Sequence, residues 1–263
     1  MSAPMKSRLF FAALLFASIT NFAAGAERAP IDERREAFTS GGRRIAVKTF
    51  APRGTDRFPA VLVLHSAAGT LLGNAPLERF ARTLAQRGTT VLMVRYFDRT
   101  GTIFAGEDEI HRRWPVWNET VRDAVDFAVE HPRVQPDHIG LFGYSLGAYL
   151  AVSEATQDNR IDAVVEIAGG LFRGYEKRTQ RVPPLLILHG RADQRVRVEN
   201  AFELARVARA RGRVPALKIY EGEGHVLSRA AMEDASARAL RFFDTHLQVS
   251  AAKTKRDDGA GNR

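Results

Sequence analysis

The stretch IGLFGYSLGAYL, residues 139–150, places a serine between two glycines where an apolar run gives way to a helical pattern. Residues 139–143 are typical of a buried strand, and residues 145–156 have the spacing of a helix. Gly143 and Gly147 allow a tight turn between the two, because a side chain at either position would collide with neighbouring chain. The stretch therefore predicts a strand, a strained turn that exposes the Ser145 hydroxyl, and a helix whose first N–H groups face that hydroxyl.

Ser145 has two interpretations, as a helix N-cap or as a nucleophile. A nucleophile requires an acid and then a histidine, each in a loop after a later strand. Asp193 follows the apolar run at 185–189, and His225 lies in a glycine-rich loop after the apolar run at 216–220. Each residue taken alone is explained as an ordinary loop residue, but their order agrees with a Ser–Asp–His triad. The pattern therefore favours the nucleophile.

Apolar runs and helical patterns alternate along most of the chain. Strands are predicted over residues 43–50, 60–65, 90–95, 139–143, 163–168, 185–189 and 216–220, and helices over residues 77–87, 116–130, 145–156, 201–211 and 230–247. This alternation indicates βαβ units, so we expect a single α/β domain with a mostly parallel, doubly wound sheet and helices on both faces. The alternating polarity of residues 43–50 predicts an antiparallel edge strand. Functional residues are expected just after the carboxyl ends of the strands.

Five segments of the chain carry a resemblance to the α/β-hydrolase superfamily and, within it, to the dienelactone hydrolase family. They are VLVLHSAAG (residues 61–69), VRYFD (94–98), GYSLG (143–147), LHGRAD (188–193) and GEGH (222–225). The best-known members of the family carry a cysteine nucleophile supported by a glutamate, whereas this chain has Ser145 and, after His65, Ser66. The resemblance implies an α/β-hydrolase fold from about residue 40 to residue 247, and a serine member with esterase-like activity rather than action on dienelactone itself.

The triad residues have separate expected roles in acyl transfer. Ser145 would attack an acyl carbonyl, His225 would accept its proton and return it to the leaving group, and Asp193 would orient the imidazole. Glu166, inside the predicted strand at 163–168, is the second candidate for the acid. The predicted function is a serine hydrolase that cleaves carboxylic esters or lactones through an acyl-enzyme intermediate. Two alternatives stay open: a small peptidase or amidase of the same fold, and a secreted binding protein with an unused hydrolase fold.

An oxyanion hole is expected from two backbone N–H groups near the serine. The motif assigns one donor to Leu146, the residue after the nucleophile. The second is expected in the loop after the predicted strand at 60–65, where the resemblance favours Ala67 and then Ser66. A plain turn is the alternative explanation for this loop of small residues.

Other residues near the predicted active edge are candidates for the substrate pocket or for structural roles. Tyr144, Asp98 and Trp114 are the pocket candidates, and packing in the core or at the rim is the alternative for the aromatic ones. His65 and His189 end strands at this edge without metal-ligand spacing. We therefore expect structural roles for both histidines, and neither a metal nor another cofactor.

The composition of the 263-residue chain limits its class. The chain has no cysteine, which excludes disulfides, thiolate metal sites and a cysteine nucleophile. Its net charge is +9, but the arginines are scattered and no basic stripe with interleaved aromatics occurs, so no nucleic-acid partner is expected. The basic segment 169–184 either overhangs the site, where it would favour anionic substrates, or forms a solvated loop. No oligomeric state is predicted.

The two ends of the chain are expected to lie outside the hydrolase domain, which is placed at residues 27–248. A positively charged start and an apolar run at residues 9–19 precede the small-residue sequence AGA, which ends at Ala26. This pattern predicts a signal peptide cleaved after Ala26, and a periplasmic or secreted protein without a stable membrane anchor. A membrane-spanning anchor is the less favoured alternative, because polar residues interrupt the run. Residues 249–263 are mostly small and charged, which predicts a disordered tail.

Overall fold

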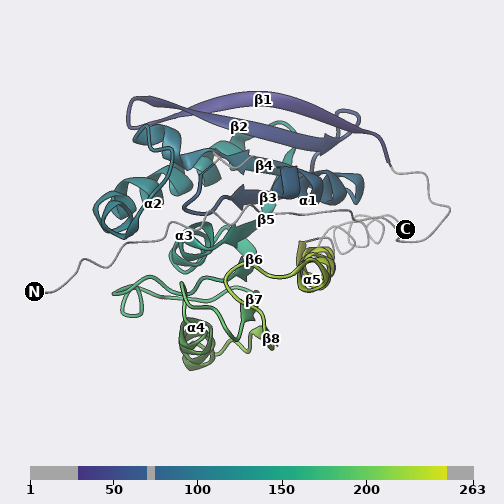
Figure 1. Cartoon of the computed structure of the whole chain (residues 1–263). Coiled ribbons are helices and arrows are strands. Elements are labelled where there is room, and N and C mark those ends of the chain that lie inside the picture. Colours follow the sequence, from purple (N-terminus) through teal and green to yellow (C-terminus); the bar gives the residue numbers. More distant parts are fainter. Residues whose placement is uncertain (1–28, 70–74, 248–263) are drawn as a thin grey trace, which may run out of the picture.

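The structure is a computed structural model that describes residues 29–69 and 75–247. The predicted signal peptide and the predicted tail lie outside these residues, so both stay predictions. The described residues form a layered α/β structure in which helices cover both faces of a central sheet (Figure 1). None of the described helices is both long and apolar enough to cross a membrane.

One eight-stranded sheet runs through the described part of the chain in the order β1-β2-β4-β3-β5-β6-β7-β8. Its strands are β1 (Ile31–Ser40), β2 (Arg43–Pro52), β3 (Phe58–Leu64), β4 (Thr90–Val94), β5 (Val134–Tyr144), β6 (Ile161–Ile167), β7 (Leu185–Gly190) and β8 (Ala216–Tyr220). β3 to β8 are parallel to one another, and only β1 and β2 are antiparallel to their neighbours. The predicted mostly parallel, doubly wound sheet is confirmed.

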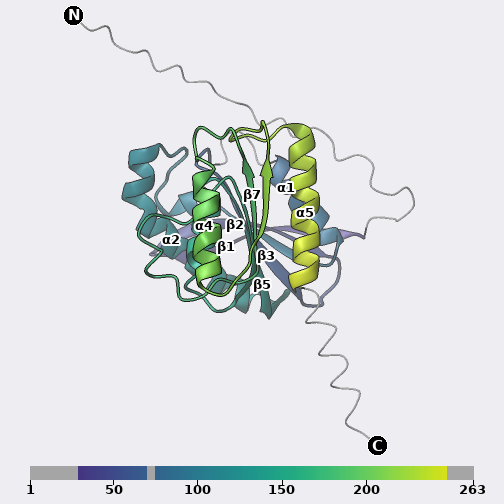
Figure 2. The same ribbon diagram turned by 90° about the horizontal axis from the view of Figure 1, so that it is seen from below.

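The helices divide between the two faces of the sheet. They are α1 (Ala75–Gln86), the short 3-10 helix η1 (Tyr96–Arg99), α2 (Glu107–Glu130), α3 (Leu146–Ala155), α4 (Glu199–Ala210) and α5 (Arg229–Leu247). α1 and α5 pack on one face and α2, α3 and α4 on the other, which is visible when the sheet is viewed along its plane (Figure 2). This arrangement leaves the loops after the parallel strands together at one edge of the sheet.

β3 shows why the central strands are apolar without alternation. Leu62 and Leu64 pack into the core with α2, α3 and α4, whereas Val61 and Val63 pack into the core with α1 and α5. Successive side chains of a strand point to opposite faces, and here both faces are buried. A polar residue on either side of β3 would therefore be removed from water.

The edge strands of the sheet are β1 and β8, so residues 43–50, which lie in β2, are antiparallel as predicted but do not form an edge. β1 pairs with β2 along its whole length, and Gly41 and Gly42, with φ of 45° and 76°, form the turn between them. The sequence of β1, IDERREAFTS, is mostly polar and charged. Charged residues suit an edge because they oppose pairing with other chains, but they also remove the apolar alternation by which a strand is recognised.

Helix α2 begins at Glu107 rather than at residue 116, where the sequence pattern placed it. Its first turn holds three acidic residues, Glu107, Asp108 and Glu109, which are favourable at the positive end of a helix. Pro115 lies inside the helix without ending it. The apolar periodicity becomes clear only after this proline, so the sequence pattern underestimates the length of the helix.

Candidate active site

The turn between β5 and α3 forces Ser145 into a strained conformation. Ser145 has φ 55° and ψ −118°, a backbone region that side-chain-bearing residues rarely adopt. A Cβ atom on Gly143 would lie 2.2 Å from the Gly147 carbonyl oxygen, and one on Gly147 would lie 2.3 Å from the Leu64 carbonyl oxygen. Both glycines are therefore required by close backbone approach, and the second one brings the start of α3 against the end of β3.

The side chain of Ser145 does not cap helix α3. No hydrogen bond runs from its hydroxyl to the N–H groups of the first turn of α3. Its own N–H donates to the Ile167 carbonyl at 2.8 Å, which ties the turn to the end of β6. The N-cap interpretation is therefore wrong, and the hydroxyl is available for another partner.

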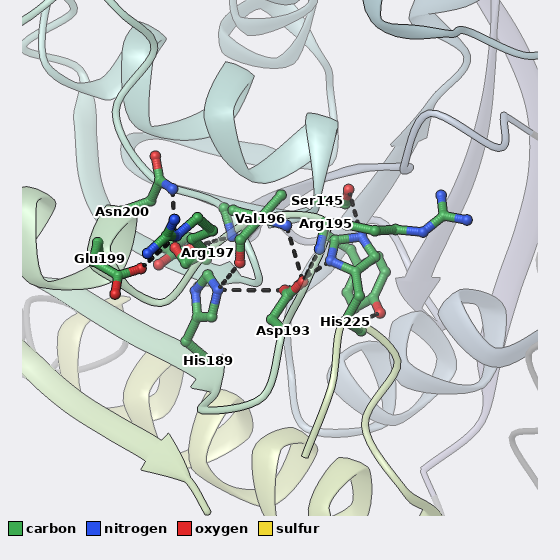
Figure 3. Close-up of polar contacts among 12 residues, drawn as sticks. Ser145, His189, Asp193, Arg195, Val196, Arg197, Glu199, Asn200 and His225 are labelled. Atoms are coloured by element: carbon green, nitrogen blue, oxygen red, sulfur yellow. Dashed lines mark hydrogen bonds and ion pairs between the residues drawn. The ribbon is translucent and has the colours of Figure 1, made fainter. Parts of the chain in front are cut away.

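That partner is His225, and the three predicted triad side chains lie together (Figure 3). The Ser145 Oγ is 3.0 Å from His225 Nε2, and His225 Nδ1 is 2.8 Å from Asp193 Oδ2. A carboxylate only accepts hydrogen bonds, so Nδ1 carries the proton and donates to Asp193. Nε2 is then free to accept the proton of the Ser145 hydroxyl. The loops after β5, β7 and β8 thus form one hydrogen-bonded row.

Asp193 is held as an ionised acceptor by its own loop. Its Oδ1 accepts the N–H groups of Arg195 at 2.8 Å and Val196 at 2.9 Å, and its Oδ2 is 3.4 Å from His189 Nε2. Burial on its own raises the pKa of this carboxyl, but hydrogen bonds from two histidines and a backbone N–H outweigh burial and hold the pKa well below its usual range. These backbone contacts form an Asx turn, which aspartate favours in loops.

The loop that carries His225 is fastened at two points. Tyr144, beside the nucleophile, donates its hydroxyl to the His225 carbonyl oxygen at 2.5 Å. The Ala192 N–H donates to the Glu223 carbonyl at 2.8 Å, and a Cβ on Gly190 would lie 2.4 Å from the same oxygen. Tyr144 is buried and supports the His225 loop, and its pocket role stays a prediction.

No hydrogen bond joins Glu166, the alternative acid, to the His225 imidazole. Its Oε2 accepts the Gly169 N–H at 2.9 Å, and its Oε1 has no hydrogen-bond partner in the described part of the chain. Burial raises the pKa of Glu166 to about 7, against an opposing effect of the nearby His189. The geometry therefore brings Asp193, and not Glu166, to the imidazole.

The raised pKa of Glu166 predicts a pH-dependent stability that Glu166→Gln removes. The folded protein keeps this proton up to about pH 7, whereas the unfolded chain releases it near the ordinary glutamate value. The free energy of unfolding of the wild type should therefore fall as pH rises through this interval, by at most about 1.4 kcal/mol per pH unit. Urea unfolding at several pH values should show the Gln variant gaining stability relative to wild type as pH rises. An exposed control, Glu221→Gln, should show no such trend, and a pH-independent difference at Glu166 would contradict the assignment.

The two predicted sources of oxyanion donors lie next to each other. Leu146 is the first residue of α3, and N–H groups in the first turn of a helix have no acceptor within the helix. In the facing loop, the Ala68 N–H is 3.3 Å from Ser66 Oγ and the Gly69 N–H is 2.9 Å from the Ser66 carbonyl oxygen. The Ala67 N–H donates to no atom of the described residues. Leu146 and Ala67 therefore stay the predicted donors, and Ser66, whose N–H likewise donates to no atom of the described residues, stays the second candidate in this loop.

The other two pocket candidates have structural contacts. Asp98 accepts the Ala46 N–H at 3.0 Å through Oδ2 and lies 3.1 Å from Arg95 through Oδ1, so it fastens η1 to β2. Trp114 is buried, donates its indole N–H to Tyr175 at 3.1 Å, and stacks on Phe172 with ring centroids 3.6 Å apart. The carboxylate of Asp98 is engaged by β2, and its role in the pocket stays a prediction. Trp114 has the alternative role, core packing.

Segment 169–184, between β6 and β7, is not a simple solvated loop. Leu171, Tyr175 and Val182 are buried against the core, and Arg211 in the turn after α4 donates to the Thr179 carbonyl at 2.9 Å. These contacts hold the segment against α2 and α4.

Within the residues that the structure describes, no group of three His, Cys, Asp or Glu side chains could hold a metal ion.

The order of the strands, the strained turn at Ser145 and the meeting of the loops after β5, β7 and β8 together define an α/β-hydrolase. A sequence model of the dienelactone hydrolase family matches residues 45–247, which is most of the chain. The chain belongs to the dienelactone hydrolase family, a family of hydrolases.

Proteins with sequence similarity carry several names. The chain is 28% identical over 166 residues to the peroxisomal succinyl-coenzyme A thioesterase of Mus musculus, covering 62% of this chain and 34% of that protein. It is 24% identical over 236 residues to YuxL, an uncharacterized peptidase of Bacillus subtilis, covering 74% of this chain and 35% of that one. The chain thus spans about a third of the length of these curated relatives.

Solved structures show the same fold. A dienelactone hydrolase-like promiscuous phosphotriesterase from metagenomic libraries aligns with TM-score 0.71 at 19% identity, covering 82% of this chain and 98% of that one. Dienelactone hydrolase from Anabaena variabilis aligns with TM-score 0.63 at 17% identity, covering 82% of this chain and 99% of that one. At such identities the alignments establish the fold alone.

Proposed function

We propose that the protein is a serine hydrolase that cleaves carboxylic esters or lactones through an acyl-enzyme intermediate. The observation that carries the proposal is the hydrogen-bonded row from Ser145 through His225 to Asp193. A serine hydroxyl is a weak nucleophile at neutral pH and needs a base within hydrogen-bond reach, which Nε2 supplies at 3.0 Å. We also propose, from the pattern in residues 1–26 alone, that the mature protein is periplasmic or secreted.

Acylation follows from these positions. The Ser145 Oγ attacks the acyl carbonyl carbon, and its proton moves to His225 Nε2. The carbonyl oxygen becomes an oxyanion, which the N–H groups of Leu146 and Ala67 stabilise. Asp193 stabilises the imidazolium that forms. The bond to the leaving group then breaks, and the leaving oxygen takes the proton from Nε2, so that an alcohol departs and Ser145 stays acylated.

Deacylation uses the same groups in reverse order. A water molecule gives a proton to His225 Nε2 and attacks the carbonyl carbon of the acyl-enzyme. The second oxyanion forms in the same hole, and its collapse breaks the bond to Ser145 Oγ, which recovers the proton from Nε2. The carboxylic acid leaves. A lactone differs only in that its leaving alcohol remains part of the acyl group, so that deacylation releases a single hydroxy acid.

The substrate class is open to a direct test, because relatives of the chain are named thioesterases and peptidases. Purified protein should turn over aryl esters, alkyl esters of graded acyl length or lactones faster than matched acyl thioesters and anilides. A fluorophosphonate should label Ser145, identified by peptide mass spectrometry. Faster turnover of the thioester or the anilide would contradict the proposed ester or lactone substrate and would favour a thioesterase or an amidase. No turnover and no label on a folded sample would support the non-catalytic binding protein instead.

A further inference from the structure

The imidazole of His65 is fixed at the end of β3, directly before the loop that holds Ala67. His65 is buried, and its ring stacks on Tyr96 with centroids 4.1 Å apart and planes 11° apart. Phe97 meets the same ring edge-on at 4.8 Å. The Tyr96 hydroxyl also donates to the His65 carbonyl oxygen at 2.7 Å. Both the side chain and the backbone of His65 are therefore held in one orientation.

The position of the proton on this imidazole follows from its partner. His65 Nδ1 lies 2.9 Å from the Ser66 carbonyl oxygen, which only accepts hydrogen bonds, so Nδ1 carries the proton. Nε2 is buried without a partner among the described residues. Burial lowers the pKa of His65 to about 4, outweighing the hydrogen bond to Ser66, and Arg95 lowers it further. The imidazole is therefore neutral near pH 7, and its Nδ1–H acts as a hydrogen-bond donor.

This hydrogen bond controls the direction of the Ala67 N–H. The Ser66 carbonyl accepts from two sides, from His65 Nδ1 and from the Gly69 N–H, each at 2.9 Å. In a trans peptide the C=O and N–H groups point in opposite directions, so fixing the Ser66 carbonyl also fixes the Ala67 N–H. The next peptide is fixed as well, because the Ala67 carbonyl accepts the Ala105 N–H at 2.9 Å.

We propose that His65 is the positioning residue of the oxyanion hole, and that its Nδ1–H donor keeps the Ala67 N–H aimed at the developing oxyanion. This inference rests on the proposed acyl-transfer function. A buried aromatic hydrocarbon would stack on Tyr96 equally well and would leave no nitrogen unpaired. The imidazole instead leaves Nε2 buried without a partner among the described residues, which is destabilising, and its Nδ1–H donates to the Ser66 carbonyl oxygen. No hydrogen bond joins His65 to Ser145, so His65 would act only through the peptide between Ser66 and Ala67.

A matched pair of variants tests the hydrogen bond separately from the shape of the side chain. Asparagine and leucine have the same branched outline, but the asparagine Nδ2 stands as many bonds from Cβ as the histidine Nδ1. His65→Leu should lower kcat for an ester by about 10²-fold, as expected when an oxyanion donor is misplaced, with KM changed by less than about threefold. His65→Asn should recover most of the loss. Equal kcat values in both variants, or a loss confined to KM, would overturn the proposal.

Two further measurements keep the result interpretable. Affinity for a trifluoromethyl ketone, which forms a tetrahedral oxyanion with a serine nucleophile, should fall in parallel with kcat in His65→Leu and recover in His65→Asn. If the leucine variant does not fold, imidazole ¹⁵N NMR of the wild type decides: His65 should show the neutral Nδ1–H tautomer from about pH 5 to 9. An Nε2–H tautomer or a titration in that range would contradict the inference. An inactive, unlabelled wild type would instead overturn the proposed function.

Discussion

Replacing Ser145 by alanine is expected to lower kcat for hydrolysis of p-nitrophenyl acetate by about 10⁶-fold, the scale seen when a serine nucleophile is removed. The variant loses the hydroxyl that lies 3.0 Å from the His225 base, so the remaining hydrolysis by water is helped only by the oxyanion hole and by substrate binding. The fold should survive, because the Ser145 N–H bond to Ile167 and both glycines of the turn are unchanged. Activity is measured by release of p-nitrophenol, and the fold by circular dichroism.

Ser153 offers a matched control for this substitution. It lies on the same helix, is buried, and has no hydrogen-bond partner for its hydroxyl among the described residues. Ser153→Ala should therefore keep wild-type activity and stability. Turnover in Ser145→Ala close to that of Ser153→Ala would remove Ser145 as the nucleophile, and with it the proposed mechanism.

Replacing Asp193 by asparagine is expected to lower kcat by about 10⁴-fold while KM changes little. The asparagine amide can present an N–H to His225 Nδ1, which favours the tautomer with the proton on Nε2. An Nε2–H group cannot accept the Ser145 proton, so the base is lost although the side chains keep their shape. The low pKa of Asp193 means that the wild-type carboxylate stays ionised at neutral and moderately acidic pH, so its titration should not limit activity there.

Glu166→Gln is the control that separates the two candidate acids. Gln keeps the acceptor for the Gly169 N–H and removes only the titratable group. Activity near the wild-type value is expected, because the Glu166 carboxyl does not reach the imidazole of His225. A large loss of kcat in Glu166→Gln with little effect in Asp193→Asn would reverse the assignment of the acid.

Several structural features were predictable because their signals are local. Gly143 and Gly147 stand two residues on either side of Ser145, and each is required by a carbonyl oxygen within about 2.3 Å of its missing Cβ. The central parallel strands are buried on both faces, which requires the continuous apolar runs that predict them. The same signal fails where burial is one-sided or absent, as in the charged edge strand β1.

The features that escaped prediction depend on neighbours distant in the sequence. Asp98 follows β4, as a functional residue would, yet its carboxylate is taken by the N–H of Ala46, 52 residues away. Tyr144 sits beside the nucleophile, but its hydroxyl supports a carbonyl 81 residues further on. His65 ends a strand at the active edge, and only the stacked ring of Tyr96 and the bond to Ser66 reveal what its imidazole does.

The sequence alone determined the α/β architecture, the turn that carries Ser145 and the chain order of serine, acid and histidine, because periodicity and glycine spacing act over a few residues. Only the tertiary structure decided between Asp193 and Glu166, since both are acidic and both lie near the carboxyl ends of apolar strands, Glu166 inside β6 and Asp193 after β7. That choice depends on which carboxylate lies within hydrogen-bond distance of the His225 imidazole. His225 is 32 residues from Asp193 and 80 residues from Ser145 in the sequence. Such distances are set by the order of β5, β6, β7 and β8 in the sheet, which brings remote loops to one edge.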